Sequence, residues 1–398
     1  MTKLIRIPKV KKRLVFSGEQ MLKFYIGLLW ANPVIINFIK AILLRIPYVN
    51  YVQEIILFAF FTISLILAIP TLTRSIPKYA YLVYLIVASV YLLNFIFFPQ
   101  NSDVLAQNIV PFLFGTLTYL FVGLGINIKR DFKMLYNISM VAIVTKFILL
   151  VIEPTNISGG DMSSSYQLLP HICLVLCVAI EKPKVLRILV SLLGVVTIFS
   201  FGTRGPLICL AILCIISLTF KKHKHPVLTY LLTIGVLALI IIFFDNILDL
   251  LKQITSLLGM STRIFDRIQS ETFFLSDGRN IITTSLLGYI KEKPLIGYGF
   301  LGDRTLIGFY SHNILIEFCI SFGVIVGVLL LIAIAIIFIK KFCLLIKEQD
   351  RYSMYFFVTL FCCGFIKLFM SGTFINEKYF FLLIGFSLTS LGRKNYMS

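Results

Sequence analysis

Twelve apolar stretches, most of them long enough to cross a lipid bilayer, divide this chain of 398 residues. The hydrocarbon core of a bilayer is about 30 Å thick, which an α-helix crosses in about 20 residues. A segment in lipid must satisfy its own backbone hydrogen bonds, so helices are expected. The stretches run at 24–44, 53–69, 79–98, 108–127, 134–152, 168–180, 185–201, 205–220, 226–244, 312–339, 353–371 and 376–391. The sequence therefore predicts an all-α polytopic membrane protein, with 1–398 as a single membrane domain.

Basic residues fall in every second connection between these stretches. The first group forms a basic segment at 1–20, whereas the connections at 99–107 and 153–167 contain no lysine or arginine. Lysine and arginine concentrate in the cytoplasmic loops of membrane proteins, so both termini are expected in the cytoplasm. The net charge of +19 is thereby explained as a topology signal, and nucleic acid is not expected as a partner.

The long polar segment 245–311 separates the ninth and tenth stretches and is expected on the outer, extracytoplasmic side. It holds seven basic and seven acidic residues, so it is neutral overall. Apolar residues recur with the 3.6-residue period of a helix over 245–258 and over 280–293. Pro294 ends the second pattern, because proline cannot continue a helix. We expect two amphipathic helices that lie flat at the outer interface.

One histidine and two arginines are expected on the outer side. His312 stands where the polar segment enters the tenth stretch, Arg279 lies within the segment, and Arg204 interrupts the apolar sequence before the eighth stretch. Charges at a membrane are costly, and they mark functional sites by default. Histidine exchanges protons near neutral pH, and arginine binds anions through paired hydrogen bonds. The three residues suggest proton transfer beside a bound anion.

Each of these residues also has a simpler interpretation. His312 could cap the tenth stretch. Arg204 could anchor a helix end at the lipid headgroups, and Arg279 could be a solvated charge paired with Asp277. Glu317 lies five residues inside the tenth stretch and needs a partner there, so an ion pair with an arginine competes with a role at the substrate.

Three lysines interrupt the apolar stretches in their expected outer halves, at Lys40, Lys146 and Lys367. Long side chains that reach the headgroups account for Lys40 and Lys367. Lys146 lies deeper, and a cationic lining of a cavity open to the outer side would suit a lipid diphosphate. We therefore count Lys146, with Glu317, among the candidate substrate-binding residues.

The order of these features resembles that of a known family. Residues 278–279, the amphipathic pattern after them, 294–299 and 311–317 are similar to the O-antigen ligase and Wzy-type polysaccharide polymerase superfamily. Members are bacterial membrane glycosyltransferases of the GT-C type, with about twelve transmembrane helices and one large outer loop between the ninth and tenth. The turn at 203–205 resembles the family's arginine motif on an earlier outer loop.

The resemblance implies direct, inverting and metal-independent transfer of a glycan from undecaprenyl diphosphate, without a cofactor. It implies that His312 is the catalytic base and that Arg204 and Arg279 bind the diphosphate. The expected partners are an undecaprenyl-diphosphate-linked glycan donor and acceptor, membrane lipid, a chain-length regulator and a flippase. The expected location is the bacterial inner membrane, which the chain would cross many times.

Several functions share parts of this pattern. A polymerase would join repeat units into O-antigen or capsular polysaccharide, whereas an O-antigen ligase would transfer the glycan to the lipid A core. A composition rich in Ile, Phe, Lys and Asn is typical of polysaccharide gene clusters and favours the polymerase. A polysaccharide flippase is the second alternative, although it should lack a histidine beside arginines in a long outer loop. A structural or sensor protein would have no reason to gather titratable groups at one face.

Overall fold

The computed structural model describes residues 20, 23–32, 35, 78–152, 162–201, 203–220, 244–257 and 279–392. These residues form helices joined by turns, and no strand occurs among them. Five of the described helical segments are long and apolar enough to cross a membrane: Pro99–Gly125, Ile128–Ile152, Ser164–Glu181, Val324–Glu348 and Arg351–Phe369. The predicted all-α membrane class is confirmed for this part of the chain. The predicted stretches at 53–69 and at 226–244, apart from residue 244, lie outside the described residues.

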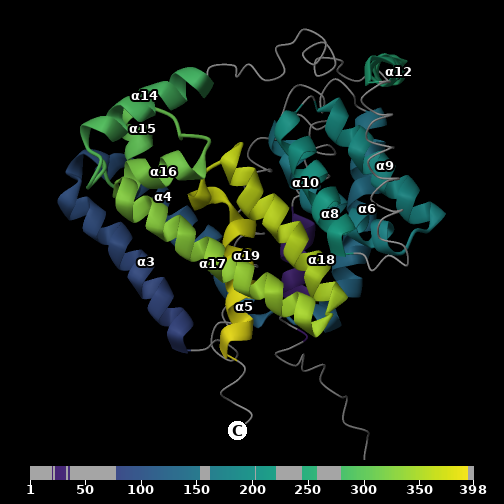
Figure 1. Ribbon diagram of the computed structural model, residues 1–398, viewed down its shortest axis with the longest axis horizontal. Coiled ribbons are helices and arrows are strands. Elements are labelled where there is room, and N and C mark those ends of the chain that lie inside the picture. The colour runs from purple at the N-terminus through teal and green to yellow at the C-terminus, as the bar shows by residue number, and fades with distance from the viewer. Residues whose placement is uncertain are drawn as a thin grey trace, which may run out of the picture.

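The helices form one bundle with a central group and two flanking groups (Figure 1). The centre holds α5 (Thr118–Gly125), α17 (Val324–Glu348), α18 (Arg351–Leu360) and α19 (Lys378–Gly392). One flank contains α6 (Ile128–Ile152), α8 (Met162–Glu181), α9 (Val185–Ser200) and α10 (Arg204–Phe220). The other contains α3 (Lys78–Phe97), α4 (Ser102–Val110), α14 (Arg279–Glu292), α15 (Gly302–Ile307) and α16 (Ile314–Phe322).

Ion pairs hold one end of the bundle together. Lys129 Nζ at the start of α6 lies 3.6 Å from Asp350 Oδ2, which precedes α18. Arg351, the first residue of α18, pairs with Glu181 at the end of α8. The helix ends remote from these pairs gather at the opposite end, which we call the site end. It comprises residues 164–166, 200–201, 203–205, 303–313 and 366–377.

The connection expected at 99–107 is helical. A short helical turn at Pro99–Asn101 leads into α4, and a wider turn at Pro111–Thr116 leads on into α5. Proline is tolerated in a first helical turn, because the N–H that it lacks has no partner there in any case. This span therefore begins about nine residues earlier than predicted, at Pro99.

The predicted tenth stretch, 312–339, is two helices rather than one. Gly323 separates α16 from α17 and has a backbone φ of 77°. A side chain at this position would place its Cβ 2.1 Å from the carbonyl oxygen of Leu295. Glycine is needed both for this left-handed backbone and for the close approach of a second segment.

The segment that approaches the break is the predicted turn at 294–299. The backbone N–H of Tyr298 donates to the carbonyl of Ile320 at 2.7 Å, and Val324 N–H donates to the carbonyl of Pro294 at 2.7 Å. These bonds satisfy backbone groups that the break between the helices would otherwise leave without partners. They also fix α15 and the chain leading to His312 against α16.

Both helices predicted within 245–311 are present. α12 spans Phe244–Leu257 and α14 spans Arg279–Glu292, while 258–278 lies outside the described residues. In α14, Leu286 is buried in a cluster with Tyr298 and Ile320, which holds the helix on α16. That 245–311 forms one large outer loop, with its helices flat on the membrane, remains a prediction.

Candidate functional site

His312 lies immediately before the residue that caps α16. Its backbone φ is 59°, a left-handed conformation that residues other than glycine rarely adopt. Asn313 is the cap, because its Oδ1 accepts from the N–H groups of Leu315 at 2.9 Å and Ile316 at 3.4 Å. Its Nδ2 donates to the carbonyl of Phe369 at 3.3 Å. The simpler interpretation of His312 as the helix cap is therefore wrong, since the neighbouring side chain has that role.

The imidazole of His312 packs against Tyr310. The two ring centroids are 4.1 Å apart, with their planes inclined by 48°. The guanidinium Cζ of Arg304 lies 5.9 Å from the centroid of the same tyrosine ring. Arginine and tyrosine attract each other in this arrangement through the negative face of the ring. Tyr310 thus connects the histidine to a buried charge cluster.

Arg304 is surrounded by two carboxyl groups and a hydroxyl. Its Nη2 donates to Thr373 Oγ1 at 3.0 Å, and its Nη1 lies 3.5 Å from Asp303 Oδ1 and 3.9 Å from Glu317 Oε1. The Thr373 hydroxyl donates to Glu317 Oε1, and the N–H of Phe374 donates to Glu317 Oε2 at 3.2 Å. Glu317 is 1% exposed. The structure therefore places Glu317 in contact with an arginine, as its ion-pair interpretation requires.

Asp303 fixes the backbone ahead of His312. Its Oδ2 accepts from the N–H of Ser311 at 2.9 Å, and its Oδ1 accepts from the N–H of Arg304 at 3.0 Å. Burial raises the pKa of Asp303 above the usual range of a carboxyl group, and the adjacent Arg304 opposes that shift. Since two carboxyl groups share one guanidinium, the cluster is neutral when one of them carries a proton.

Arg204 is the first residue of α10, and its side chain lies outside the described part of the structure. The residues on either side are tied to α8. Thr203 Oγ1 donates to Ser165 Oγ at 2.8 Å. A Cβ at Gly205 would lie 1.8 Å from the hydroxyl oxygen of Tyr166, so a larger residue cannot occupy this position unless the tyrosine moves. This turn of the chain is thus held closely against the start of α8.

Lys146 reaches the same group of residues from α6. Its side chain is 6% exposed, and its Nζ lies 3.5 Å from Ser164 Oγ and 5.4 Å from the ring centroid of Phe201. Phe201 lies two residues before the turn at 203–205, and Ser164 adjoins the residue of α8 to which that turn is hydrogen-bonded. Lys146 and the backbone of Arg204 therefore belong to one neighbourhood.

Lys367 also joins this neighbourhood, which corrects the expectation that it reaches the headgroups. It pairs with Glu377, and the two side chains are 16% and 5% exposed. Its Nζ lies 4.8 Å from the ring centroid of Tyr166. The carboxylate of Glu377, which directly precedes α19, neutralises the charge of Lys367 inside the protein, so the lysine does not need the lipid headgroups for this. Lys40 lies outside the described residues.

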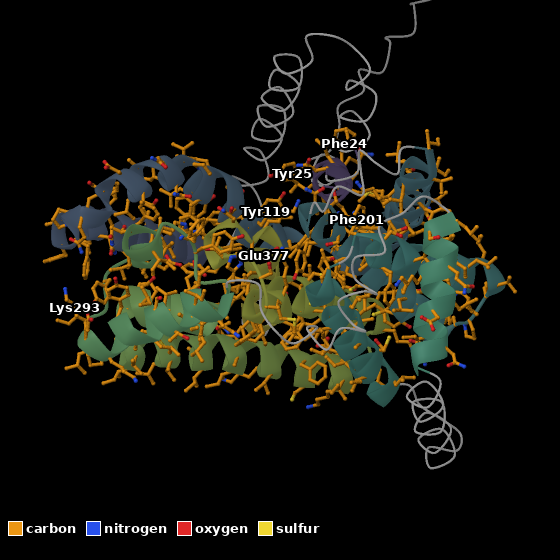
Figure 2. All side chains as sticks on the ribbon, turned by 90° about the horizontal axis from the view of Figure 1, so that it is seen from above. Phe24, Tyr25, Tyr119, Phe201, Lys293 and Glu377 are labelled. Atoms are coloured by element: carbon orange, nitrogen blue, oxygen red, sulfur yellow. The ribbon has the colours of Figure 1, made fainter. Side chains whose placement is uncertain are left out.

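Residues 366–377 connect the two halves of the site end. Phe369 and Thr373 contact the residues around His312, whereas Lys367 and Glu377 lie beside the start of α8 and α10. In the view of Figure 2, Glu377 lies between Lys293 and Phe201, toward the Phe201 side. The residues around His312 and those around the backbone of Arg204 therefore both contact this one short segment.

Arg279 is the first residue of α14, and its side chain is not among those described. Its helix packs on α16, the helix that directly follows the His312 turn. Within the described residues, no group of three or more His, Cys, Asp or Glu side chains is arranged to hold a metal ion.

Sequence reasoning missed four residues of the site end: Asp303, Arg304, Thr373 and Glu377. In the sequence, Asp303 and Arg304 are simply two of the balanced charges in the polar segment 245–311. Thr373 gave no signal, because its partners lie more than 50 positions away. Glu377 could have been noticed as an acidic residue at the start of an apolar stretch, ten positions after Lys367.

The comparisons with known proteins bear on this same region. Residues 189–332 match the family model described as O-antigen ligase. The matched span includes Arg204, Arg279, His312 and Glu317, and Lys146 precedes it. No match was found among curated proteins or among solved structures. The family match confirms the resemblance drawn from the sequence, because residues 189–332 are similar to the O-antigen ligase family.

Proposed function

We propose that this protein is a polymerase that joins undecaprenyl-diphosphate-linked oligosaccharide repeat units into O-antigen or capsular polysaccharide. The observation that carries the proposal is the left-handed His312 turn, held at the same end of the bundle as the Thr203–Gly205 turn and Lys146. The acceptor hydroxyl attacks the anomeric carbon of the donor. The bond from that carbon to the diphosphate oxygen breaks, and the configuration inverts.

His312 is the general base in this scheme. A neutral imidazole accepts the proton of the acceptor hydroxyl as the new glycosidic bond forms. The contact with Tyr310 and the bond from Ser311 N–H to Asp303 restrict where the ring can lie. Such restriction favours catalysis, because the base must lie within hydrogen-bond reach of the hydroxyl.

The cations supply the charge that the departing diphosphate needs. Arg204 and Arg279 would bind its oxygens in pairs, and Lys146 would add a positive charge from beneath the α10 turn. Glu317 acts through Arg304, because its carboxylate helps to hold the Arg304 guanidinium beside Tyr310. Glu317 is then a positioning residue for the histidine turn, and its contact with substrate is indirect.

The reaction takes place on the outer face of the bacterial inner membrane, with both chain termini in the cytoplasm. Undecaprenyl diphosphate carries donor and acceptor glycans, and membrane lipid surrounds the helices. A flippase would deliver these substrates, and a chain-length regulator would limit the product. The basic connections beside the ion-paired end support this orientation.

An O-antigen ligase is the second candidate, because the matched family is described by that name. The two reactions differ in the acceptor, so a gene deletion separates them. Loss of a polymerase leaves single repeat units on the lipid A core. Loss of a ligase leaves finished polymer on undecaprenyl diphosphate, and loss of a flippase leaves single repeats on the cytoplasmic side of the membrane.

A further inference from the structure

Arg304 has hydrogen-bond donors that its buried neighbours do not use. Its guanidinium donates to Thr373 Oγ1 at 3.0 Å and to Asp303 Oδ1 at 3.5 Å. A guanidinium carries five N–H groups, and the others have no hydrogen-bond acceptor among the described residues. The side chain is 14% exposed, so part of it is accessible from outside the protein. The unused N–H groups are therefore available to a bound ligand.

The positive charge of Arg304 is already compensated. The carboxyl oxygens of Asp303 and Glu317 lie 3.5 Å and 3.9 Å from its Nη1, and both side chains are fully buried. Two carboxyl groups beside one guanidinium leave this cluster neutral or negative, so it does not attract an anion such as a diphosphate. A hydroxyl group accepts a hydrogen bond without bringing a charge, and it is the partner that fits the unused N–H groups.

Two aromatic side chains follow Arg304 on the same short stretch of chain. Gly308 ends α15 with a backbone φ of 76°, and a Cβ placed there would have no atom within 4 Å. The next residue, Phe309, is 64% exposed and makes no ring contact with the described residues. Tyr310 is half-buried, and its ring packs on the imidazole of His312. A donor group, an exposed ring and a half-buried ring thus directly precede the proposed base.

This combination fits a sugar ring. A pyranose presents C–H groups on its faces, which pack on the negative face of an aromatic ring, and it presents hydroxyl groups around its edge. Binding sites for small ligands commonly combine aromatic walls with a few fixed polar groups. An exposed phenylalanine can also anchor a protein at the membrane interface. An anchor, however, requires only an apolar side chain and no neighbouring hydrogen-bond donors.

We propose that Arg304, Phe309 and Tyr310 form the subsite for the acceptor sugar. A general base must lie within hydrogen-bond reach of the hydroxyl that it deprotonates, so the acceptor ring lies against the residues next to His312. Arg304 donates to a second hydroxyl of that sugar, and Phe309 packs on its C–H face. The inference rests on the proposed function, because it takes His312 as the base.

The proposal predicts a graded effect of substitutions at Phe309. Phe309→Ala removes the ring and should weaken sugar binding about 2- to 10-fold. Phe309→Trp keeps an aromatic face and should bind as the wild type does. Phe309→Leu keeps an apolar side chain without a flat face, so it should weaken binding as alanine does, whereas a membrane anchor would tolerate leucine.

Arg304→Lys tests the donor groups separately. Lysine retains a positive charge between Asp303 and Glu317, but it cannot reproduce the planar fork of a guanidinium. Sugar binding should therefore weaken by about tenfold or more. If this variant does not fold, as judged by size-exclusion and thermal unfolding profiles, the three Phe309 variants decide the question alone.

The experiment measures Kd by ligand-observed NMR with the purified full-length protein in lipid nanodiscs. The probe is the free oligosaccharide obtained from the lipid-linked repeat unit by mild acid, which carries neither diphosphate nor lipid. Undecaprenyl diphosphate without a glycan is the second probe, and its Kd should be the same in every variant. Phe97→Ala is the matched control, because Phe97 is a 70% exposed phenylalanine at the end of α3.

Wild-type affinity for the oligosaccharide in Phe309→Leu would contradict the subsite, as would equal weakening in Phe97→Ala. Wild-type protein that does not bind the oligosaccharide would also contradict it. If the protein forms lipid-linked polymer while the variants bind the oligosaccharide normally, the subsite fails and the polymerase stands. If the variants weaken oligosaccharide binding but the wild type transfers no glycan, the proposed function fails and the sugar subsite stands.

Discussion

Arg304 Nη2 donates a 3.0 Å hydrogen bond to the hydroxyl of Thr373, which lies 69 positions further along the chain. The same hydroxyl donates to Glu317, and the guanidinium lies beside the ring that packs on His312. The turn before α16 is therefore tied to the segment between α18 and α19. Disturbing this bond should move the histidine without touching the cations around Arg204.

Thr373→Val should lower kcat while leaving the KM for the lipid-linked donor near its wild-type value. The substitution removes the hydroxyl that Arg304 and Glu317 share, and a hydrogen bond to a charged group contributes about 1.5–3 kcal/mol. Thr373→Ser keeps the hydroxyl and should restore kcat. Thr305→Val is the control, because Thr305 is exposed on α15. Equal kcat values for the Val and Ser variants at position 373 would show that the bond does not position the site.

Arg204→Ala and Arg279→Ala should each reduce glycan transfer strongly while the protein still inserts into the membrane. Lysine should rescue poorly at both positions, because a point charge cannot reproduce the forked contact of a guanidinium with a diphosphate. Arg187→Ala is the control, since Arg187 bonds to the carbonyl of Lys182 at 2.8 Å near the ion-paired end. Full activity in both alanine variants would remove the two arginines from the site, and full activity in both lysine variants would mean that simple charge suffices.

Asn313→Ala should lower both stability and activity. Loss of an N-cap typically costs about 1 kcal/mol, which a thermal unfolding midpoint can report. Asp350 caps α18 at the other end by accepting from Ser353 N–H at 3.3 Å. Asp350→Ala should lose similar stability with little loss of activity per folded molecule. If the two variants lost activity equally, the effect of Asn313 would be one of stability alone.

Membrane orientation can be tested with single cysteines at two exposed positions. Lys293→Cys follows α14, and Lys184→Cys precedes α9 near the ion-paired end. The exposed native Cys343 is first replaced by serine. A membrane-impermeant thiol reagent added from outside should label position 293 and miss position 184. The reverse labelling would place the whole site end in the cytoplasm and contradict the proposed reaction.

Much of the bundle could be predicted because the length of an apolar stretch reports directly on a membrane helix. The helical period likewise revealed α12 and α14. The division of 312–339 could not be predicted, because Gly323 becomes a break only when the carbonyl of Leu295 approaches it. A glycine within an apolar stretch carries no such information by itself.

The residues of the candidate site could likewise be predicted only in part. His312 and Lys146 were visible as single polar residues against an apolar background. The pairing of Lys367 with Glu377 depends on how 370–376 folds between them, and the Arg304–Thr373 bond joins distant parts of the chain. Neither contact leaves a local pattern in the sequence.

The pH dependence of transfer follows from the role of His312. A general base must be neutral, and histidine ordinarily titrates near pH 6.5, give or take about one unit in proteins. The rate of glycan transfer should therefore fall as the pH drops through that range and the imidazole becomes protonated. The measurement is the initial rate at saturating donor, with donor binding followed in parallel so that a loss of affinity is not mistaken for a loss of catalysis.

The most direct test of His312 as the catalytic base uses purified protein and an undecaprenyl-diphosphate-linked repeat unit. Wild-type protein should produce a ladder of longer lipid-linked glycans and release undecaprenyl diphosphate. His312→Ala should slow this by about 10²–10⁴-fold and still bind the donor, because the cations hold the diphosphate. His223→Ala, in the basic connection at 221–225, should behave as wild type. A His312→Ala protein that builds the ladder at the wild-type rate would contradict the catalytic assignment.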